Sequence, residues 1–165
     1  MSFYKPKPNT RDPAGQMTII HRFGIRFRHV RNYKYQLLSQ YTFTLPPAFG
    51  GQNSIEDMFL AYEKTGRKLI IKKGHAWDGP SGPSLDTPDF MRASLVHDCL
   101  YQLMHFAHGR HPLNGKFSYK MKPHADKLLA EIAKQDGMTS FRANYVHMAV
   151  KLFGGMQFSK QEKRS

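Results

Sequence analysis

The two halves of the chain differ in the spacing of their apolar positions. Before about residue 86, apolar and polar residues alternate, as they do in strands with one buried face. After that point, apolar residues recur every three or four positions, as on one face of a helix. The pattern predicts an α+β fold, with a small antiparallel β-rich N-terminal half packed with a three-helix C-terminal half.

Three alternating segments of the first half predict strands. The first, residues 20–30, would have one apolar and one basic face (Phe23, Ile25 and Phe27 against Arg22, Arg26 and Arg28). The second, residues 40–47, ends at two prolines, and the third, residues 67–74, ends at a glycine. Residues 53–66, between them, fit either a short helix or an irregular strand.

The second half contains start and stop signals for three helices. The sequence Thr87-Pro88-Asp89 is typical of a helix start and predicts a helix over about 88–107. Two more are expected over 123–136 and over 139–153, the latter ending at a pair of glycines. The third helix has an apolar stripe that would face the core: Phe141, Tyr145, Met148 and Leu152.

A chain of 165 residues is long enough for one domain that is stabilised by packing alone. We expect a single α+β domain over 16–155, with a basic extended arm before it (1–15), a polar tail after it (156–165), a β-rich part (16–75) and a Gly/Pro-rich loop (74–88). The single cysteine, Cys99, precludes an internal disulfide. The sequence predicts neither a signal peptide nor a transmembrane segment.

The formal net charge of +13 predicts an anionic partner, either a phospholipid surface or nucleic acid. The candidate anion-binding face comprises Arg22, Arg26, Arg28, Arg31 and Lys34. Aromatic residues interleave with these positions, so the face could follow a nucleic-acid backbone or bring the protein to anionic lipid. The alternative is a solvated strand face without a ligand.

The sequence LVHDCLYQL, residues 95–103, places a histidine in the middle of an apolar helical stripe. A buried imidazole needs partners for its ring nitrogens, and Asp126 on the second predicted helix is the candidate. Nearby Ala130 and Ala133 would let the two helices approach closely. Asp98 would lie at the edge of the stripe, where it could reach a loop or a metal. A buried ion pair that only fixes helix packing is an equally weighted alternative.

The Gly/Pro-rich loop 74–88 could supply oxygen ligands to a hard cation, because its carbonyl groups lack partners in a regular ladder. The candidate metal ligands are Asp98 together with Asp78, Gly79, Ser81 and Gly82. So few carboxylates predict weak calcium binding, on the order of 10⁻⁴ to 10⁻³ M. Loop capping by Asp78 and Ser81 is the alternative, and it is slightly favoured.

The H-D-x-x-Y helix, followed by a helix bearing A-D, resembles the catalytic core of phospholipase A2, most closely the compact viral capsid type. The resemblance implies that His97 is the general base and that Asp126 orients it with support from Tyr101. It also implies that Asp98 binds calcium, which would stabilise the oxyanion of an ester under attack.

A broader stretch is similar to a family of small, uncharacterised phage-encoded proteins: RKLIIKKGHAWDGPSGPS, LVHDCLY, HADKLLAEIAKQDG and AVKLFGG. This similarity implies a location in the virion or the host cytoplasm and, as an alternative to phospholipid hydrolysis, a non-catalytic virion component that contacts nucleic acid or neighbouring subunits. A third hypothesis, an HD-type phosphohydrolase, would need an upstream histidine on a helix, whereas His75 lies in the predicted loop. The oligomeric state is left open.

Overall fold

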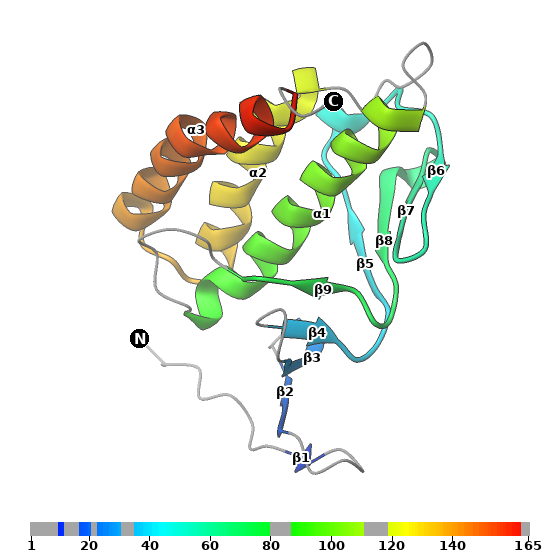
Figure 1. Ribbon diagram of the computed structural model, residues 1–165. Helices are drawn as coiled ribbons and strands as arrows, with labels where there is room; N and C mark the ends of the chain where they lie inside the picture. The colour runs from blue at the N-terminus through cyan, green and yellow to red at the C-terminus, as the bar shows by residue number, and fades with distance from the viewer. Residues whose placement is uncertain are drawn as a thin grey trace. The chain divides into compact units, whose positions relative to one another are not determined.

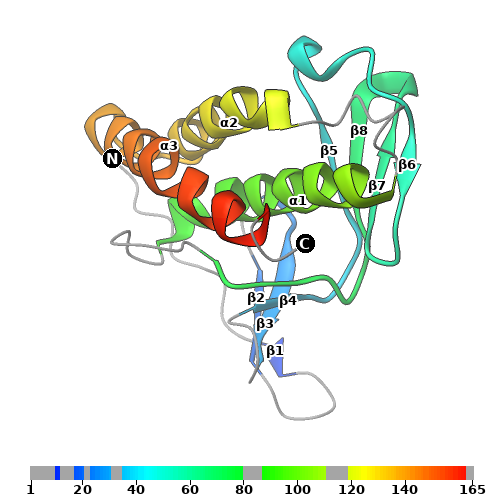
Figure 2. The same cartoon turned by 45° about the horizontal axis from the view of Figure 1, so that its top comes forward.

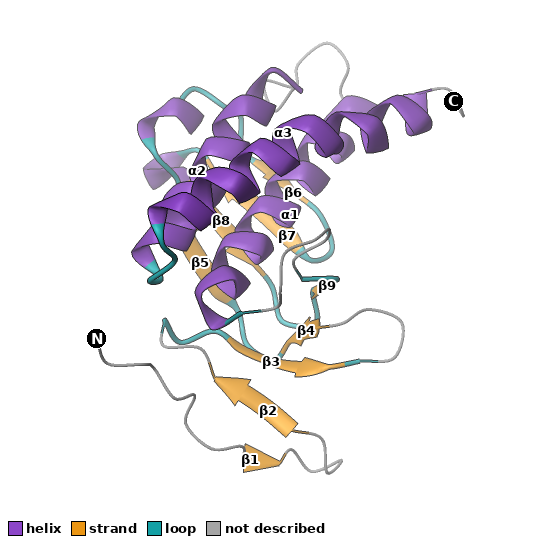
Figure 3. Cartoon of the chain, turned by 90° about the vertical axis from the view of Figure 1, so that its left-hand side faces the viewer, coloured by secondary structure: helices purple, strands orange, loops and turns teal. Residues whose placement is uncertain are grey.

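The computed structural model describes residues 10–11, 17–20, 23–30, 35–79, 87–110 and 119–162. The chain divides into two compact units, residues 1–79 and 80–165. All described strands belong to the first unit and all described α-helices to the second, which confirms the predicted α+β class (Figures 1 and 3). The expectation of one domain over 16–155 stays a prediction.

The first sheet is antiparallel, with the strand order β1-β2-β3-β4-β9. Its strands are β1 (Thr10–Arg11), β2 (Met17–Ile20), β3 (Arg26–His29), β4 (Tyr35–Leu37) and β9 (Ala76–Trp77). A cluster of buried aromatic rings covers one face, with the Tyr35 ring 5.3 Å from Phe27 and 5.4 Å from Trp77, centroid to centroid. Most of this sheet lies where no strand was expected: β1 is in the predicted arm, β9 is in the predicted Gly/Pro loop, and β4 and most of β2 lie outside the three expected strands.

The single strand expected over residues 20–30 is wrong. The segment contains the end of β2, a turn and then β3, because Gly24 adopts the left-handed conformation (φ 78°) that favours glycine. Phe23 therefore lies beside the turn and is exposed, whereas Ile25 and Phe27 are buried as predicted.

The second sheet is also antiparallel, with the strand order β5-β8-β7-β6. Its strands are β5 (Tyr41–Thr44), β6 (Ile55–Glu56), β7 (Leu60–Glu63) and β8 (Lys68–Ile71). The undecided segment 53–66 therefore contains a hairpin of β6 and β7, in which Leu60, Ala61 and Tyr62 are all buried. A 3₁₀ turn (Pro47–Phe49) follows β5, and the Tyr62 hydroxyl donates a hydrogen bond to the Phe49 carbonyl at 2.8 Å.

The described part of the second unit contains α1 (Pro88–Arg110), a 3₁₀ turn (Tyr119–Met121), α2 (Lys122–Gln135) and α3 (Ser140–Glu162). Helix α2 contacts both other α-helices (Figures 1 and 2). All three predicted helices are present. The expected Thr139 cap is confirmed, since the Arg142 N–H donates to its hydroxyl oxygen. The third helix does not end at Gly154 and Gly155 but continues through the first part of the predicted tail, because glycine weakens a helix without removing a backbone donor.

The predicted core stripe of the third helix is wrong at its described positions. Phe141, Tyr145 and Met148 are 86, 52 and 62% exposed. Instead, Ala143 and Val146 are buried, and they are the buried residues among positions 140–151 of α3, where burial is described. A helix with apolar residues on two faces can bury either one, and here small residues face inward. The side chain of Leu152 lies outside the described residues.

Within the described ranges, no helix combines the length and the apolar character needed to cross a membrane.

Candidate active site

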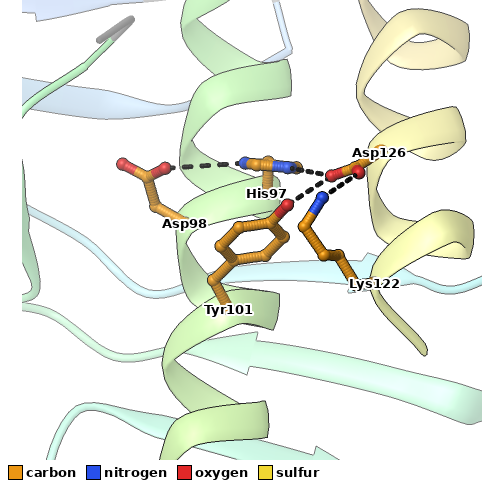
Figure 4. Close-up of polar contacts among 5 residues, drawn as sticks. All are labelled: His97, Asp98, Tyr101, Lys122 and Asp126. Carbon is orange, nitrogen blue, oxygen red and sulfur yellow. Dashed lines mark hydrogen bonds and ion pairs between the residues drawn. The ribbon is translucent and has the colours of Figure 1, made fainter. Parts of the chain in front are cut away.

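The predicted pairing of His97 with Asp126 is confirmed (Figure 4). Nε2 of His97, on α1, lies 3.0 Å from Oδ1 of Asp126, on α2. The two side chains are 7 and 2% exposed, so the contact lies inside the helical unit. Ala130 and Ala133 are buried, as expected for two helices that approach closely.

Asp126 has three partners rather than one. Besides His97, the Tyr101 hydroxyl donates to Oδ1 at 2.5 Å, and the Lys122 ammonium lies 2.7 Å from Oδ2. Tyr101 thus makes the contact with Asp126 that the resemblance to phospholipase A2 implied. Lys122 was not predicted, although a lysine four residues before an aspartate on one helix is a recognisable signal for an ion pair.

The three partners determine the charge state of Asp126. Burial by itself would raise the pKa of the carboxyl group, but the hydrogen bonds from His97, Lys122 and Tyr101 outweigh burial and lower it to about 2. Burial and the neighbouring carboxylate raise the pKa of the Tyr101 hydroxyl, which therefore stays protonated as a donor. The site therefore contains a buried carboxylate that is ionised at neutral pH.

His97 lies between two carboxylates. Its Nδ1 is 3.7 Å from Oδ1 of Asp98, too far for a direct hydrogen bond, while Nε2 contacts Asp126 (Figure 4). Burial by itself lowers the pKa of His97, but the hydrogen bond with Asp126 and the nearby Asp98 carboxylate raise it above its usual 6.5. The side chain of Asp98 is 31% exposed, whereas that of His97 is 7% exposed.

The predicted calcium site is described only in part. Asp98 offers a hard, partly exposed carboxylate, which fits calcium as a single ligand. Asp78 is exposed and Gly79 is buried with a φ of 70°, whereas Ser81 and Gly82 lie outside the described residues. No group of three or more His, Cys, Asp or Glu side chains suited to a metal occurs in the described part of the chain. Calcium, which also uses carbonyl ligands, stays a prediction.

The predicted anion-binding face is likewise described only in part. Arg26 is exposed on β3, but the Arg28 guanidinium donates two hydrogen bonds to the Gln36 side chain of the neighbouring strand, at 2.9 and 3.1 Å. Arg22, Arg31 and Lys34 lie outside the described residues. Arg28 is therefore held against the sheet by a side-chain partner.

The single cysteine does not add a nucleophile to the site. Cys99 is fully buried, and burial raises the pKa of its thiol well above the ordinary value.

Comparison with protein-family models, with curated proteins and with solved structures gives no match for this chain.

Proposed function

We propose that the helical unit is a hydrolase that uses His97 to activate water for attack on a phospholipid ester, with calcium as cofactor. One observation carries the proposal: Asp126 engages Nε2 of His97 at 3.0 Å, while Nδ1 lies 3.7 Å from the partly exposed Asp98 carboxylate. A histidine held at one nitrogen by a buried carboxylate has its other nitrogen available as a base.

The proton movements follow from this arrangement. When neutral His97 donates its Nε2 hydrogen to Asp126, the lone pair remains on Nδ1. Nδ1 then accepts a proton from the attacking water, and the ionised Asp126 stabilises the imidazolium that forms. The imidazolium afterwards returns the proton to the leaving alcohol, so the enzyme ends in its starting state.

Asp98 supports the same step from the other side of the ring. Nδ1 and the nearer Asp98 oxygen are 3.7 Å apart, so a single water molecule can contact both atoms. Asp98 is also the residue that would hold calcium. When bound, calcium would supply positive charge for the ester carbonyl and its oxyanion.

Phospholipid is proposed as the substrate for two reasons. The residues His97, Asp98, Tyr101 and Asp126 match the phospholipase A2 pattern, and three of them form the contacts that this pattern implies. In addition, the net charge of +13 favours binding to an anionic lipid surface.

The proposal is tested by release of fatty acid from anionic phospholipid vesicles in calcium at roughly millimolar concentration. The His97→Gln variant is expected to lose on the order of 10²- to 10⁴-fold in rate, which is the usual contribution of a positioned base. His105→Gln is the matched control, because His105 is an exposed histidine on the same helix. Circular dichroism would establish that both variants keep the helices.

Two results would contradict the proposal. If the wild-type protein releases no fatty acid from any vesicle at this calcium concentration, the helical unit is not a phospholipase. If His97→Gln is as active as the wild-type protein, hydrolysis takes place without this centre.

A second candidate function is a non-catalytic virion component that contacts nucleic acid or neighbouring subunits. The charge of +13 and the exposed Arg26 on β3 favour it. It predicts that the protein is present in purified particles, and its absence from them would exclude this role.

A further inference from the structure

The Lys122 ammonium is the partner of Asp126 that neither the sequence pattern nor the phospholipase resemblance anticipated. We propose that Lys122 is a positioning residue, which holds the Asp126 carboxylate so that neutral His97 keeps its hydrogen on Nε2 and presents its Nδ1 lone pair to water. The inference deepens the proposed function and depends on it for its catalytic meaning.

The contacts divide the two oxygens of Asp126 between different partners. Oδ1 accepts from His97 and Tyr101, and Oδ2 contacts Lys122 at 2.7 Å. A carboxylate engaged at both oxygens cannot rotate without breaking one of these contacts. Lys122 therefore keeps Oδ1 directed at the imidazole (Figure 4).

The position of Lys122 adds a reason to assign it a specific role. Its side chain is 18% exposed, and its ammonium lies 5.8 Å from the centre of the Tyr101 ring. By contrast, Lys127 on the same helix forms an ion pair of the same spacing with Glu131, but at 3.7 Å and with 72 and 46% exposure. Lys122 is the one of these two lysines that is withdrawn from solvent and held close to its carboxylate.

The test is nitrogen NMR of the His97 ring in the substrate-free, full-length protein, in alkaline buffer where the ring is neutral. The wild-type spectrum should show the hydrogen on Nε2. In Lys122→Met the ring should become a mixture of both tautomers, whereas Lys122→Arg should restore the wild-type form. Lys127→Met, which removes the exposed lysine, should leave the His97 spectrum unchanged.

A Lys122→Met spectrum identical to that of the wild type would overturn the inference, because the tautomer would then not depend on Lys122. If Lys122→Met does not fold, a measurement on the wild-type protein alone tests the inference. The inference requires a Lys122 ammonium signal that exchanges slowly with water, and rapid exchange would contradict a fixed contact with Asp126.

The NMR result separates this inference from the proposed function. If the wild-type protein hydrolyses phospholipid, Lys122→Met should reduce the maximal rate by roughly 10- to 100-fold, which is part of the contribution of a positioned base. If the wild-type protein is inactive, the proposed function fails. The tautomer measurement then still decides whether Lys122 positions the pair.

Discussion

His97 lies within an apolar helical stripe, and its burial explains why its partner could be predicted from the sequence. A buried imidazole needs polar contacts, and few carboxylates are placed on an apolar helix face, so Asp126 was the natural choice. The contact with Lys122 was harder to anticipate, because an i,i+4 lysine on a helix is usually exposed and weakly coupled. Its burial follows from the packing of α1 against α2.

The substitution Tyr101→Phe tests whether the Tyr101 hydroxyl stabilises the buried Asp126 carboxylate. The substitution removes the hydroxyl that donates to the buried carboxylate and keeps the ring. We expect the free energy of unfolding to fall by about 1.5–3 kcal/mol, as for other hydrogen bonds to charged groups. Urea denaturation would measure it, with Tyr145→Phe as the control at an exposed tyrosine. Equal stability of the two variants would show that the Tyr101 hydroxyl does not support Asp126.

His75 predicts a pH dependence of stability. Burial lowers its pKa from 6.5 to about 4, so the unfolded chain binds a proton more readily than the folded protein does. The stability that the protein gains by keeping His75 neutral is fully present above pH 6.5. It is lost as the pH falls toward 4, by up to about 3 kcal/mol, because one pKa unit corresponds to about 1.4 kcal/mol. Urea denaturation of wild-type protein and of His75→Gln across this range should show a shallower decline in the variant.

His105→Gln provides the comparison for that experiment, because it removes an exposed histidine and should keep the wild-type decline. His97 contributes in the opposite direction. Its raised pKa favours the folded state at low pH, and this contribution is lost as the pH rises through the folded-state value. Because the wild-type protein and His75→Gln both retain His97, the difference between their free energies of unfolding reports the effect of His75 alone.

At the scale of elements, Arg92 joins α1 to the end of α2. Its guanidinium lies 2.7 and 3.1 Å from the two carboxylate oxygens of Asp136, and the side chains are 9 and 0% exposed. Arg92→Met would leave a buried carboxylate without its cation, and we expect a loss of about 3–5 kcal/mol in unfolding free energy. Lys127→Met, which breaks an exposed pair, should cost less than about 1 kcal/mol. Similar losses in the two variants would contradict a buried role for Arg92.

Substitutions on the exposed face and on the buried face of α3 should differ in how much they change the free energy of unfolding. Replacing the exposed Phe141 and Met148 together by serine should change the free energy of unfolding by less than about 0.5 kcal/mol for each residue. Val146→Ser should destabilise the protein by more than 1 kcal/mol, since it places an unpaired hydroxyl among buried apolar groups. A large effect at the exposed pair would mean that this face is covered in solution.

At the scale of the whole molecule, the net charge of +13 predicts strong salt dependence for any contact with an anionic polymer or surface. The affinity for duplex DNA or for anionic vesicles should fall linearly on a log–log plot against salt concentration, because binding releases counterions from the anion. Fluorescence anisotropy with labelled DNA and vesicle sedimentation would measure both. Affinity that does not change with salt would show that charge does not drive the contact.

Local properties of the sequence determined the fold class, the three helices and the pairing of His97 with Asp126. Periodicity, caps and the need of a buried imidazole for a partner are all visible along the chain. Only the tertiary structure decided which face of α3 is buried, where the turn at Gly24 divides two strands, and that Lys122 joins Asp126. The burial of one face of α3 and of the Lys122–Asp126 pair depends on which neighbouring element is present, because burial is decided by contacts between segments that are distant in the sequence.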